Sequence, residues 1–145
     1  MCYKAFMSAY ETVSKLVKEW QPDTLPTELK YRDSLLGFLR EGMKNATVEP
    51  EYRHIGTTID IYVKQSTFWD TTEAFIELKR NLTAKTQLDR LVGQVESLRP
   101  DKNNIVVVLC GDTNPTLISR FKEKYHLDGS VLWSRVALII KTPKS

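Results

Sequence analysis

Two charged residues stand inside an apolar segment, Phe-Ile-Glu-Leu-Lys at residues 75–79, that is otherwise typical of a buried strand. Side chains alternate between the two faces of a strand. Glu77 and Lys79 should therefore share one face of this strand, and the apolar side chains of Ile76 and Leu78 should share the other. The two charges are expected to face one common site.

A further carboxylate, that of Asp60, stands in the preceding strand-like segment, Thr-Thr-Ile-Asp-Ile-Tyr-Val at residues 57–63. By the same alternation, its side chain should point away from the face that carries Ile59 and Ile61. If the two segments pair, directly opposed side chains come within about 5 Å at Cβ. The carboxylates of Asp60 and Glu77 can then converge.

Two carboxylates at such a separation repel each other unless a cation lies between them. Hard oxygen ligands favour Mg²⁺ or Mn²⁺ over metals that prefer softer ligands. A nearby lysine can position an attacking water or help to deprotonate it, while the metal polarises a phosphate oxygen and stabilises the leaving group. The residue types and their spacing therefore favour hydrolysis of a phosphodiester bond.

The surrounding sequence predicts the elements that hold these residues. Apolar residues at alternating steps of three and four indicate helices, and period-two alternation or a continuous apolar run indicates strands. Helices are expected at residues 3–20, 27–44, 84–98 and 114–127. Strands are expected at residues 47–55, 57–63, 74–80, 105–111 and 130–142.

Capping and periodicity give further detail to three of the helices. The first helix should bury a face that includes Val13 and Val17, and the second should bury a face that includes Leu29. The last helix should begin with Asn114 as its cap and Pro115 in its first turn.

The order of these elements, α-α-β-β-β-α-β-α-β, predicts an α/β fold with a mixed sheet flanked by helices. Three consecutive strands indicate an antiparallel meander, and the fully apolar run at residues 105–111 is expected at the centre of the sheet. A single domain is predicted over residues 1–145. Its parts are an N-terminal amphipathic helix at 1–22, a core at 27–112, and a C-terminal helix and strand at 113–145.

Asp60 together with Glu77-x-Lys79, set in the order helix, meander, helix, strand, resembles the PD-(D/E)xK nuclease superfamily. The resemblance covers residues 27–112 and implies a restriction-endonuclease-like core of order α-β-β-β-α-β. It also implies a nuclease that uses Mg²⁺ or Mn²⁺ to hydrolyse DNA, with Asp60 and Glu77 as metal ligands and Lys79 as the catalytic lysine. The chain departs from the family motif at Ile59, where the motif has proline.

Members of this superfamily often add an acidic residue from the helix that precedes the meander. The candidates in that helix are Glu28, Asp33 and Glu41. Glu28 is preferred as a third metal ligand because its separation from Asp60 resembles that in archaeal Holliday junction resolvases. Alternatively, Glu28 only stabilises the positive end of its helix, and Glu49 or Glu51 serves instead.

The helix after the third strand carries a polar line beside its apolar stripe, formed by Gln87, Arg90 and Gln94. In RecB-like relatives a glutamine on this helix borders the active site, and the resemblance implies this role for Gln94. Leu98 stands where such relatives have a tyrosine. Simple solvation of Gln94 at the surface is the alternative.

Three cations, Arg80, Lys85 and Arg90, lie on the same approach to the predicted site. They are expected to bind nucleic acid by contacting phosphates, a contribution that salt weakens. Ordinary solvated charges are the alternative interpretation of all three.

Two adjacent aromatic residues, Phe68 and Trp69, fall between the second and third predicted strands. They have the chemistry to stack on bases, but the preferred interpretation is that they cover one end of the core. His54 and His126 are the two histidines, and their isolation favours neither a zinc site nor a histidine-based catalytic triad.

The composition sets broader limits. The formal charge of +3 is compatible with nucleic-acid binding but too small to indicate it. Cys2 and Cys110 do not form the pattern of a disulfide framework, which favours a reducing, cytoplasmic setting, or the host cytoplasm if the protein is viral. No apolar run approaches the roughly 20 residues of a membrane span, so no membrane partner is expected.

DNA is the expected partner, and a chain of this length has little room for a separate recognition domain. A homodimer or a partner protein is therefore expected to supply specificity. The alternative function is that of a noncatalytic module that binds nucleic acid or takes part in an assembly and retains the nuclease fold, because a fold does not guarantee an activity.

Overall fold

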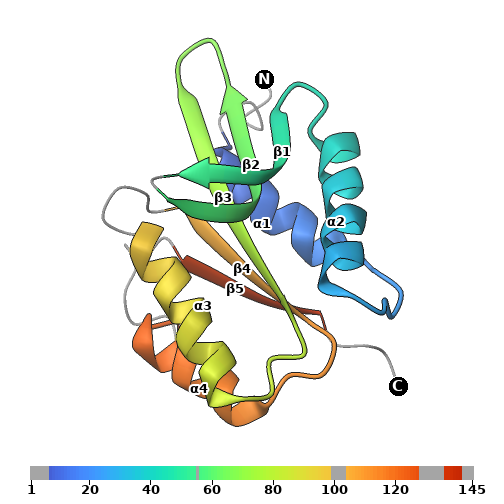
Figure 1. The fold of residues 1–145 in the computed structure, drawn as a ribbon. Helices are drawn as coiled ribbons and strands as arrows, with labels where there is room; N and C mark the ends of the chain where they lie inside the picture. The colour runs from blue at the N-terminus through green and yellow to red at the C-terminus, as the bar shows by residue number, and fades with distance from the viewer. Residues whose placement is uncertain (1–6, 55, 99–103, 128–135, 142–145) are drawn as a thin grey trace.

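The computed structural model describes residues 7–54, 56–98, 104–127 and 136–141. Over these residues the elements follow one another in the predicted order (Figure 1). The helices are α1 (Ala9–Glu19), α2 (Glu28–Gly42), α3 (Lys85–Leu98) and α4 (Pro115–Lys124). The strands are β1 (Thr47–His54), β2 (Thr57–Ser66), β3 (Thr71–Arg80), β4 (Ile105–Cys110) and β5 (Val136–Lys141).

The five strands form one open, mixed sheet in the order β1-β2-β3-β4-β5. β1, β2 and β3 pair antiparallel, which confirms the predicted meander, whereas β3, β4 and β5 pair parallel. β4 is buried along its whole length, as its apolar run predicts. The central position belongs to β3, however, because two strands lie on one side of it and two on the other. The strand that carries Glu77 and Lys79 is therefore the middle strand of the sheet.

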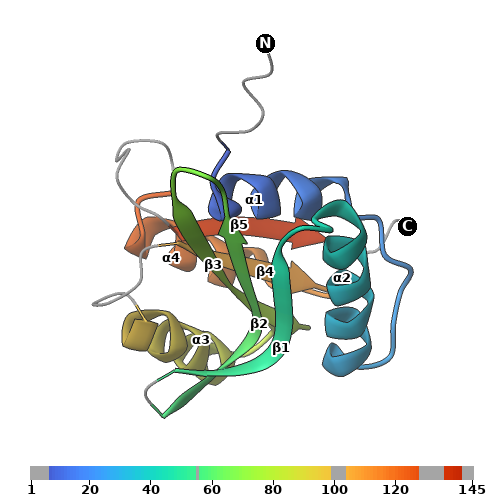
Figure 2. The ribbon, with the colours of Figure 1, turned by 90° about the horizontal axis from the view of Figure 1, so that it is seen from above.

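Helices cover both faces of the sheet, as Figure 2 shows from above. α1 and α2 pack on one face, and α3 and α4 pack on the other. α3 connects the parallel strands β3 and β4, and α4 connects β4 and β5, as parallel pairing requires. The protein is thus an α/β structure with three layers over the residues described.

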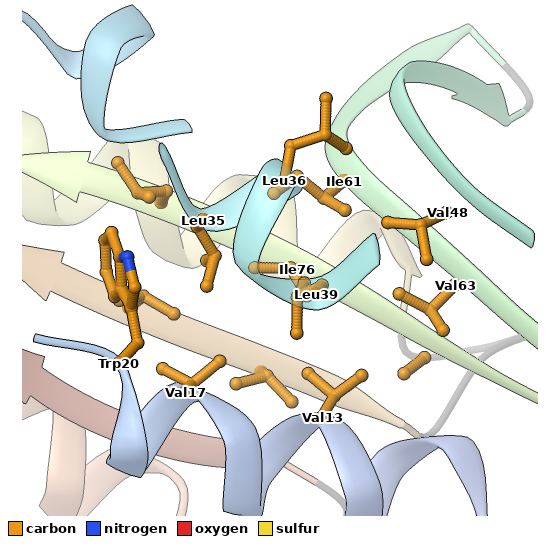
Figure 3. Packing of buried hydrophobic residues seen from close by; sticks show 14 of the residues in the cluster. Val13, Val17, Trp20, Leu35, Leu36, Leu39, Val48, Ile61, Val63 and Ile76 are labelled. Atoms are coloured by element: carbon orange, nitrogen blue, oxygen red, sulfur yellow. The ribbon is translucent and has the colours of Figure 1, made fainter. Parts of the chain in front are cut away.

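The layer between the sheet and the first two helices is a continuous apolar core (Figure 3). Val13 and Val17 of α1 and Leu35 and Leu39 of α2 are fully buried and face Ile76 of β3. Each fully buried side chain of this kind contributes about 1.5–3 kcal/mol relative to an exposed one. This layer holds α2, and hence its N-terminal turn, in place against β3.

A second apolar layer lies under α3 and α4. It combines Leu88, Leu91 and Val95 of α3 with Leu117 and Phe121 of α4. The predicted amphipathic stripe of α3 is therefore confirmed. Because this stripe faces the sheet, the polar side of α3 is left for solvent and for the edge of any site at the end of β3.

The ends of the helices follow their capping residues. Ser8 caps α1 by accepting from the backbone N–H of Glu11. The described part of the predicted 3–20 helix therefore begins at Ala9, later than expected, and residues 3–6 lie outside the described residues. Asn114 caps α4 and Pro115 occupies its first turn, as predicted. The beginning of the last predicted strand, residues 130–135, also lies outside the described residues.

Two predictions about burial are wrong. Leu29 is 53% exposed, because it lies beside the buried stripe of α2, whose first core residue is Tyr31. Phe68 and Trp69 are 90% and 76% exposed rather than packed over the core. They occupy the turn between β2 and β3, which projects at the top of Figure 1 beyond the helices that cover the sheet.

Two further predictions concern cysteine and the membrane. Cys110 is buried and is a free thiol, as expected of a small core side chain, whereas Cys2 lies outside the described residues. Among the described residues, no helix combines the length and the apolar character that crossing a membrane requires.

Candidate active site

A distortion in the β1–β2 pair lies directly opposite Asp60. The register pairs Pro50 with Ile61 and Tyr52 with Ile59, so Glu51 stands opposite Asp60. Glu51 has a positive φ of 52°, which is uncommon for a residue with a side chain. The two strands therefore change direction at this position.

The distortion overturns one predicted feature of β2. Regular alternation would place Ile59 and Ile61 on the same face of the sheet, away from Asp60. Instead, Ile59 belongs to the core layer under α3 and α4, and Ile61 belongs to the layer under α1 and α2. A strand that twists at Asp60 carries its two apolar neighbours into opposite layers and leaves the carboxylate between them.

The side chain of Asp60 replaces a backbone acceptor where β2 and β3 separate. The paired positions of these strands run from Ser66–Thr71 to Ile61–Ile76. Beyond them, Asp60 Oδ2 accepts a hydrogen bond of 2.8 Å from the backbone N–H of Leu78. Burial raises the pKa of Asp60, and this hydrogen bond and the charge of Lys79 oppose the rise. The carboxylate is thus held against the backbone of β3, next to Glu77.

Glu77 is the only fully buried charged side chain among the described residues. The predicted alternation along β3 is confirmed, because Phe75 belongs to the layer under α3 and α4 whereas Ile76 and Leu78 belong to the other layer. Both carboxylate oxygens of Glu77 are buried, and no donor group within the described structure makes a hydrogen bond to them. Such a group is costly to bury as an anion unless a proton or a cation compensates it.

The protonation of Glu77 follows from this environment. Burial, followed by the charge of Asp60, raises the pKa of Glu77 to about 9. At neutral pH the side chain is therefore mainly protonated, and the carboxyl of Asp60 is the acceptor for that proton. Strongly perturbed carboxyls beside a lysine are typical of functional sites.

Lys79 lies half-buried near the end of β3 and lines a small open cavity of about 140 Å³. The residues that line it come from α2, β3, α3 and the β3–α3 connection. They are Glu28, Lys79, Arg80, Leu82, Gln87 and Arg90. The structure therefore brings together four of the residues singled out in the sequence, and three of these are cations.

Glu28 stands at the first turn of α2, where Thr27 is the cap. The residue as a whole is exposed, but partial burial of its carboxyl raises the pKa of Glu28, and the positive charge of Lys79 opposes the rise. The charge of Asp60 also acts on Glu28. Among the described residues, no three acidic, histidine or cysteine side chains are grouped closely enough to hold a metal ion. The role of Glu28 as a third ligand stays a prediction.

The arginine at the end of β3 is tied to the loop before α2. Arg80 Nε donates a hydrogen bond of 3.2 Å to the backbone carbonyl of Leu25. Arg80 and Arg90 both line the cavity, as their predicted approach to phosphate requires. Lys85 does not line it. Its exposed ammonium is 4.0 Å from the carboxylate of Asp89 on the same helix.

On α3, a different glutamine from the predicted one lines the cavity. Gln87 does so, and its Oε1 accepts hydrogen bonds from the backbone N–H groups of Thr83 and Ala84. Gln94 lies two turns further along the helix and is not among the lining residues, and its Oε1 is buried without a hydrogen-bond partner. The signal for Gln87 was its place three residues after Ala84, where a glutamine side chain reaches back to the start of a helix.

Arg32 of α2 is a second residue that sequence reasoning missed. Its guanidinium donates to Glu51 at 2.8 Å, and its charge also acts on Asp60. Arg32 therefore bridges α2 to the distorted part of β1 next to the carboxylate pair. The sequence signal for Arg32 was its position about one turn after Glu28 on the predicted helix, which places both side chains on the same face.

No comparison with known proteins identifies the role of this site. No protein-family model, no curated protein and no solved structure matches the chain. The site combines the fully buried carboxyl of Glu77 with the half-buried carboxyl of Asp60, a lysine two residues after Glu77 on the same strand, and two arginines at an open cavity. Such a set can bind a divalent cation and an anionic substrate next to each other.

Proposed function

We propose that the protein is a metal-dependent nuclease of the PD-(D/E)xK type that hydrolyses DNA phosphodiester bonds. The observation that carries the proposal is Glu77, a fully buried carboxyl that receives no hydrogen bond from a donor group. It lies beside Asp60 of β2 and shares β3 with Lys79. The element order over residues 27–112 and the central position of β3 support a restriction-endonuclease-like core.

The residues present fit a hard divalent cation. Once the proton shared by Glu77 and Asp60 has left, all the oxygens of the two carboxylates are acceptors and none is a donor. Mg²⁺ and Mn²⁺ prefer such oxygens, and Mg²⁺ often binds through one or two carboxylates together with water and substrate phosphate. When bound, the metal would supply polarisation of the phosphate and charge neutralisation at the leaving oxygen.

The remaining groups act on the water and on the substrate. Asp60 and Glu77 do not line the cavity, but Lys79 does, and its charge acts on both carboxyls. Its ammonium can therefore orient the attacking water and stabilise the anionic phosphate. Arg80 and Arg90 hold the phosphates of the DNA strand at the cavity. Gln87 lines the same cavity and can offer its amide to a phosphate oxygen. DNA is the proposed partner, with a second copy or another protein supplying specificity.

Metal binding should release a proton, because Glu77 is mainly protonated at neutral pH and must lose its proton to bind a cation. Calorimetric titration with Mn²⁺ should show binding that strengthens between about pH 6 and 8, with a heat that depends on the ionisation enthalpy of the buffer. Asp60→Asn and Glu77→Gln should each abolish it. The matched control, Asp89→Asn on the exposed side of α3, should bind like the wild type. If Asp60→Asn and Glu77→Gln both bind Mn²⁺ like the wild type, the alternative function as a noncatalytic module is favoured.

Phosphate binding at the cavity can be measured without cleavage. Arg90→Ala should weaken DNA binding in EDTA by a similar factor for every sequence and should reduce the slope of log K against log salt by about 1. Lys122→Ala provides the control, because it removes an exposed cation from α4, outside the cavity. Equal salt slopes for Arg90→Ala and the wild type would show that Arg90 does not contact a phosphate.

A further inference from the structure

The turn between β2 and β3 is held in one conformation by its own hydrogen bonds. The backbone N–H of Thr67 donates to the carbonyl of Asp70 at 2.7 Å. Thr67 Oγ1 in turn accepts from the backbone N–H groups of Trp69 and Asp70, and the carboxylate of Asp70 accepts from the N–H of Thr71. The two residues at the tip, Phe68 and Trp69, are therefore presented on a fixed backbone.

The aromatic rings at this tip pack on each other and not on the rest of the protein. Phe68 and Trp69 are 90% and 76% exposed, and their ring centroids are 4.8 Å apart in an edge-to-face arrangement. Exposed aromatic pairs on a rigid turn are unfavourable in water and are well suited to contact a partner. Trp69 therefore offers a broad, ordered ring face to a flat partner.

A polar cavity lies at the foot of the same turn. It has a volume of about 320 Å³, and its lining includes Lys44 and Asn45, which follow α2, and Gln65, Ser66 and Thr67 at the end of β2. Gln65 Oε1 is buried there without a hydrogen-bond partner, and the side chain of Lys44 is exposed. The cavity reaches Thr67, which directly precedes Phe68. The hydrogen-bonding groups and the cation of the cavity therefore lie at the base of the turn whose tip carries the aromatic rings.

We propose that this tip and cavity form a site for an unpaired stretch of nucleic acid, in which a base stacks on Phe68 or Trp69 and presents its edge to the polar cavity. A base needs a ring to stack on, hydrogen-bonding partners for its edge and a cation for its phosphate, and the turn, the exposed Asn45 and Lys44 supply these in order. Bases in a paired duplex do not expose their faces, so the site selects single-stranded segments.

Other partners fit the tip less well. A membrane or an apolar groove on another protein would favour apolar neighbours around the rings, whereas here Ser66, Thr67, Asp70 and Thr71 surround them. A second copy of the chain would need a matching apolar surface. The described large hydrophobic side chains that are exposed are Leu29, Phe68 and Trp69, which offer no such surface.

This inference rests on the proposed nuclease function in one respect, because it names the kind of substrate which that site would cut. Asp60 and Ser66 are six residues apart on β2, or roughly 20 Å along an extended strand. One DNA molecule can therefore reach both sites if an unpaired segment lies near the cleaved bond. Flaps, branches and partly opened duplexes have this character.

Binding in EDTA tests the site independently of cleavage. Fluorescence anisotropy should show that Phe68→Ala/Trp69→Ala lowers the affinity for an unstructured thymidine oligonucleotide by about 10- to 100-fold. The affinity for a blunt duplex should change by less than about threefold. The conservative variant, Phe68→Tyr/Trp69→Phe, should bind single strands nearly as well as the wild type. Trp133 lies outside the described residues, so the quenching of intrinsic fluorescence by the oligonucleotide is measured in a Trp133→Phe background. There Trp69→Phe should remove most of the quenching, because Trp20 is buried.

The outcomes separate this site from the catalytic one. Equal losses on single strands and duplex, no loss at all, or a change in oligomeric state by light scattering when the rings are removed would each overturn the inference. Retained, ring-dependent binding by a wild-type protein that does not cleave DNA with Mn²⁺ would support this site while contradicting the nuclease proposal. Because the rings are exposed, circular dichroism should show native folding of both double variants.

Discussion

Replacing Lys79 by alanine should reduce DNA cleavage by at least about 100-fold, because positioned groups that handle a proton or a developing charge contribute roughly 10²- to 10⁴-fold. The fold should survive, since Lys79 is half-buried at an open cavity and is not part of either apolar layer. Single-turnover cleavage with Mn²⁺ measures the rate, and thermal unfolding confirms the fold.

Two further variants serve as controls for the Lys79→Ala result. Lys79→Arg keeps the positive charge but places a larger, planar guanidinium in the cavity. It should retain DNA binding and lose most of the cleavage. Lys122→Ala on α4 should cleave at the wild-type rate. A Lys79→Ala protein that cleaves within about twofold of the wild type would remove this lysine from the mechanism.

Replacing Glu77 by glutamine should abolish cleavage and, in EDTA, stabilise the fold at neutral and alkaline pH. The folded protein raises the pKa of Glu77 from its ordinary value near 4.5 to about 9. The folded state therefore binds more protons than the unfolded state between these values, and the stability of the wild type falls as pH rises through this range. Glutamine removes this penalty, which should amount to about 5 kcal/mol at pH 8.

Urea unfolding at several pH values in EDTA measures this effect. The stability gain of Glu77→Gln over the wild type should be near zero at about pH 4 and should grow steadily towards pH 8. Glu41→Gln, which changes an exposed carboxylate on α2, should show no such trend. Added Mn²⁺ should stabilise the wild type and Glu41→Gln but not Glu77→Gln. A Glu77→Gln protein that is less stable than the wild type at pH 8 would mean that Glu77 is a paired structural anion.

The parts of the site that follow from local geometry could be predicted. Alternation along β3 correctly gave Ile76 and Leu78 to one core layer and set Glu77 apart from them. The meander and the order of the helices brought Glu28 and Lys79 to the same cavity. These features depend on the two-residue period of a strand and on the length of each element, both of which are present in the sequence.

The parts that depend on tertiary fit could not be predicted. The positive φ of Glu51 and the twist at Asp60 arise where two strands separate. Pro50, which precedes Glu51, is typical of edge strands and bulges, but it does not show that the neighbouring strand twists at Asp60. The choice between Gln87 and Gln94 depends on where α3 begins relative to the end of β3. The exposure of Phe68 depends on how far the β2–β3 turn extends beyond the helices (Figure 1).

The most direct measurement of the central proposal is cleavage by the purified wild-type protein of a panel of DNA substrates that includes single strands, duplex, flaps and four-way junctions. With Mg²⁺ or Mn²⁺ at least one substrate should be cut, and EDTA or the Lys79→Ala substitution should stop the cutting. A folded protein that binds Mn²⁺ through Asp60 and Glu77 and leaves every substrate intact would contradict the nuclease function.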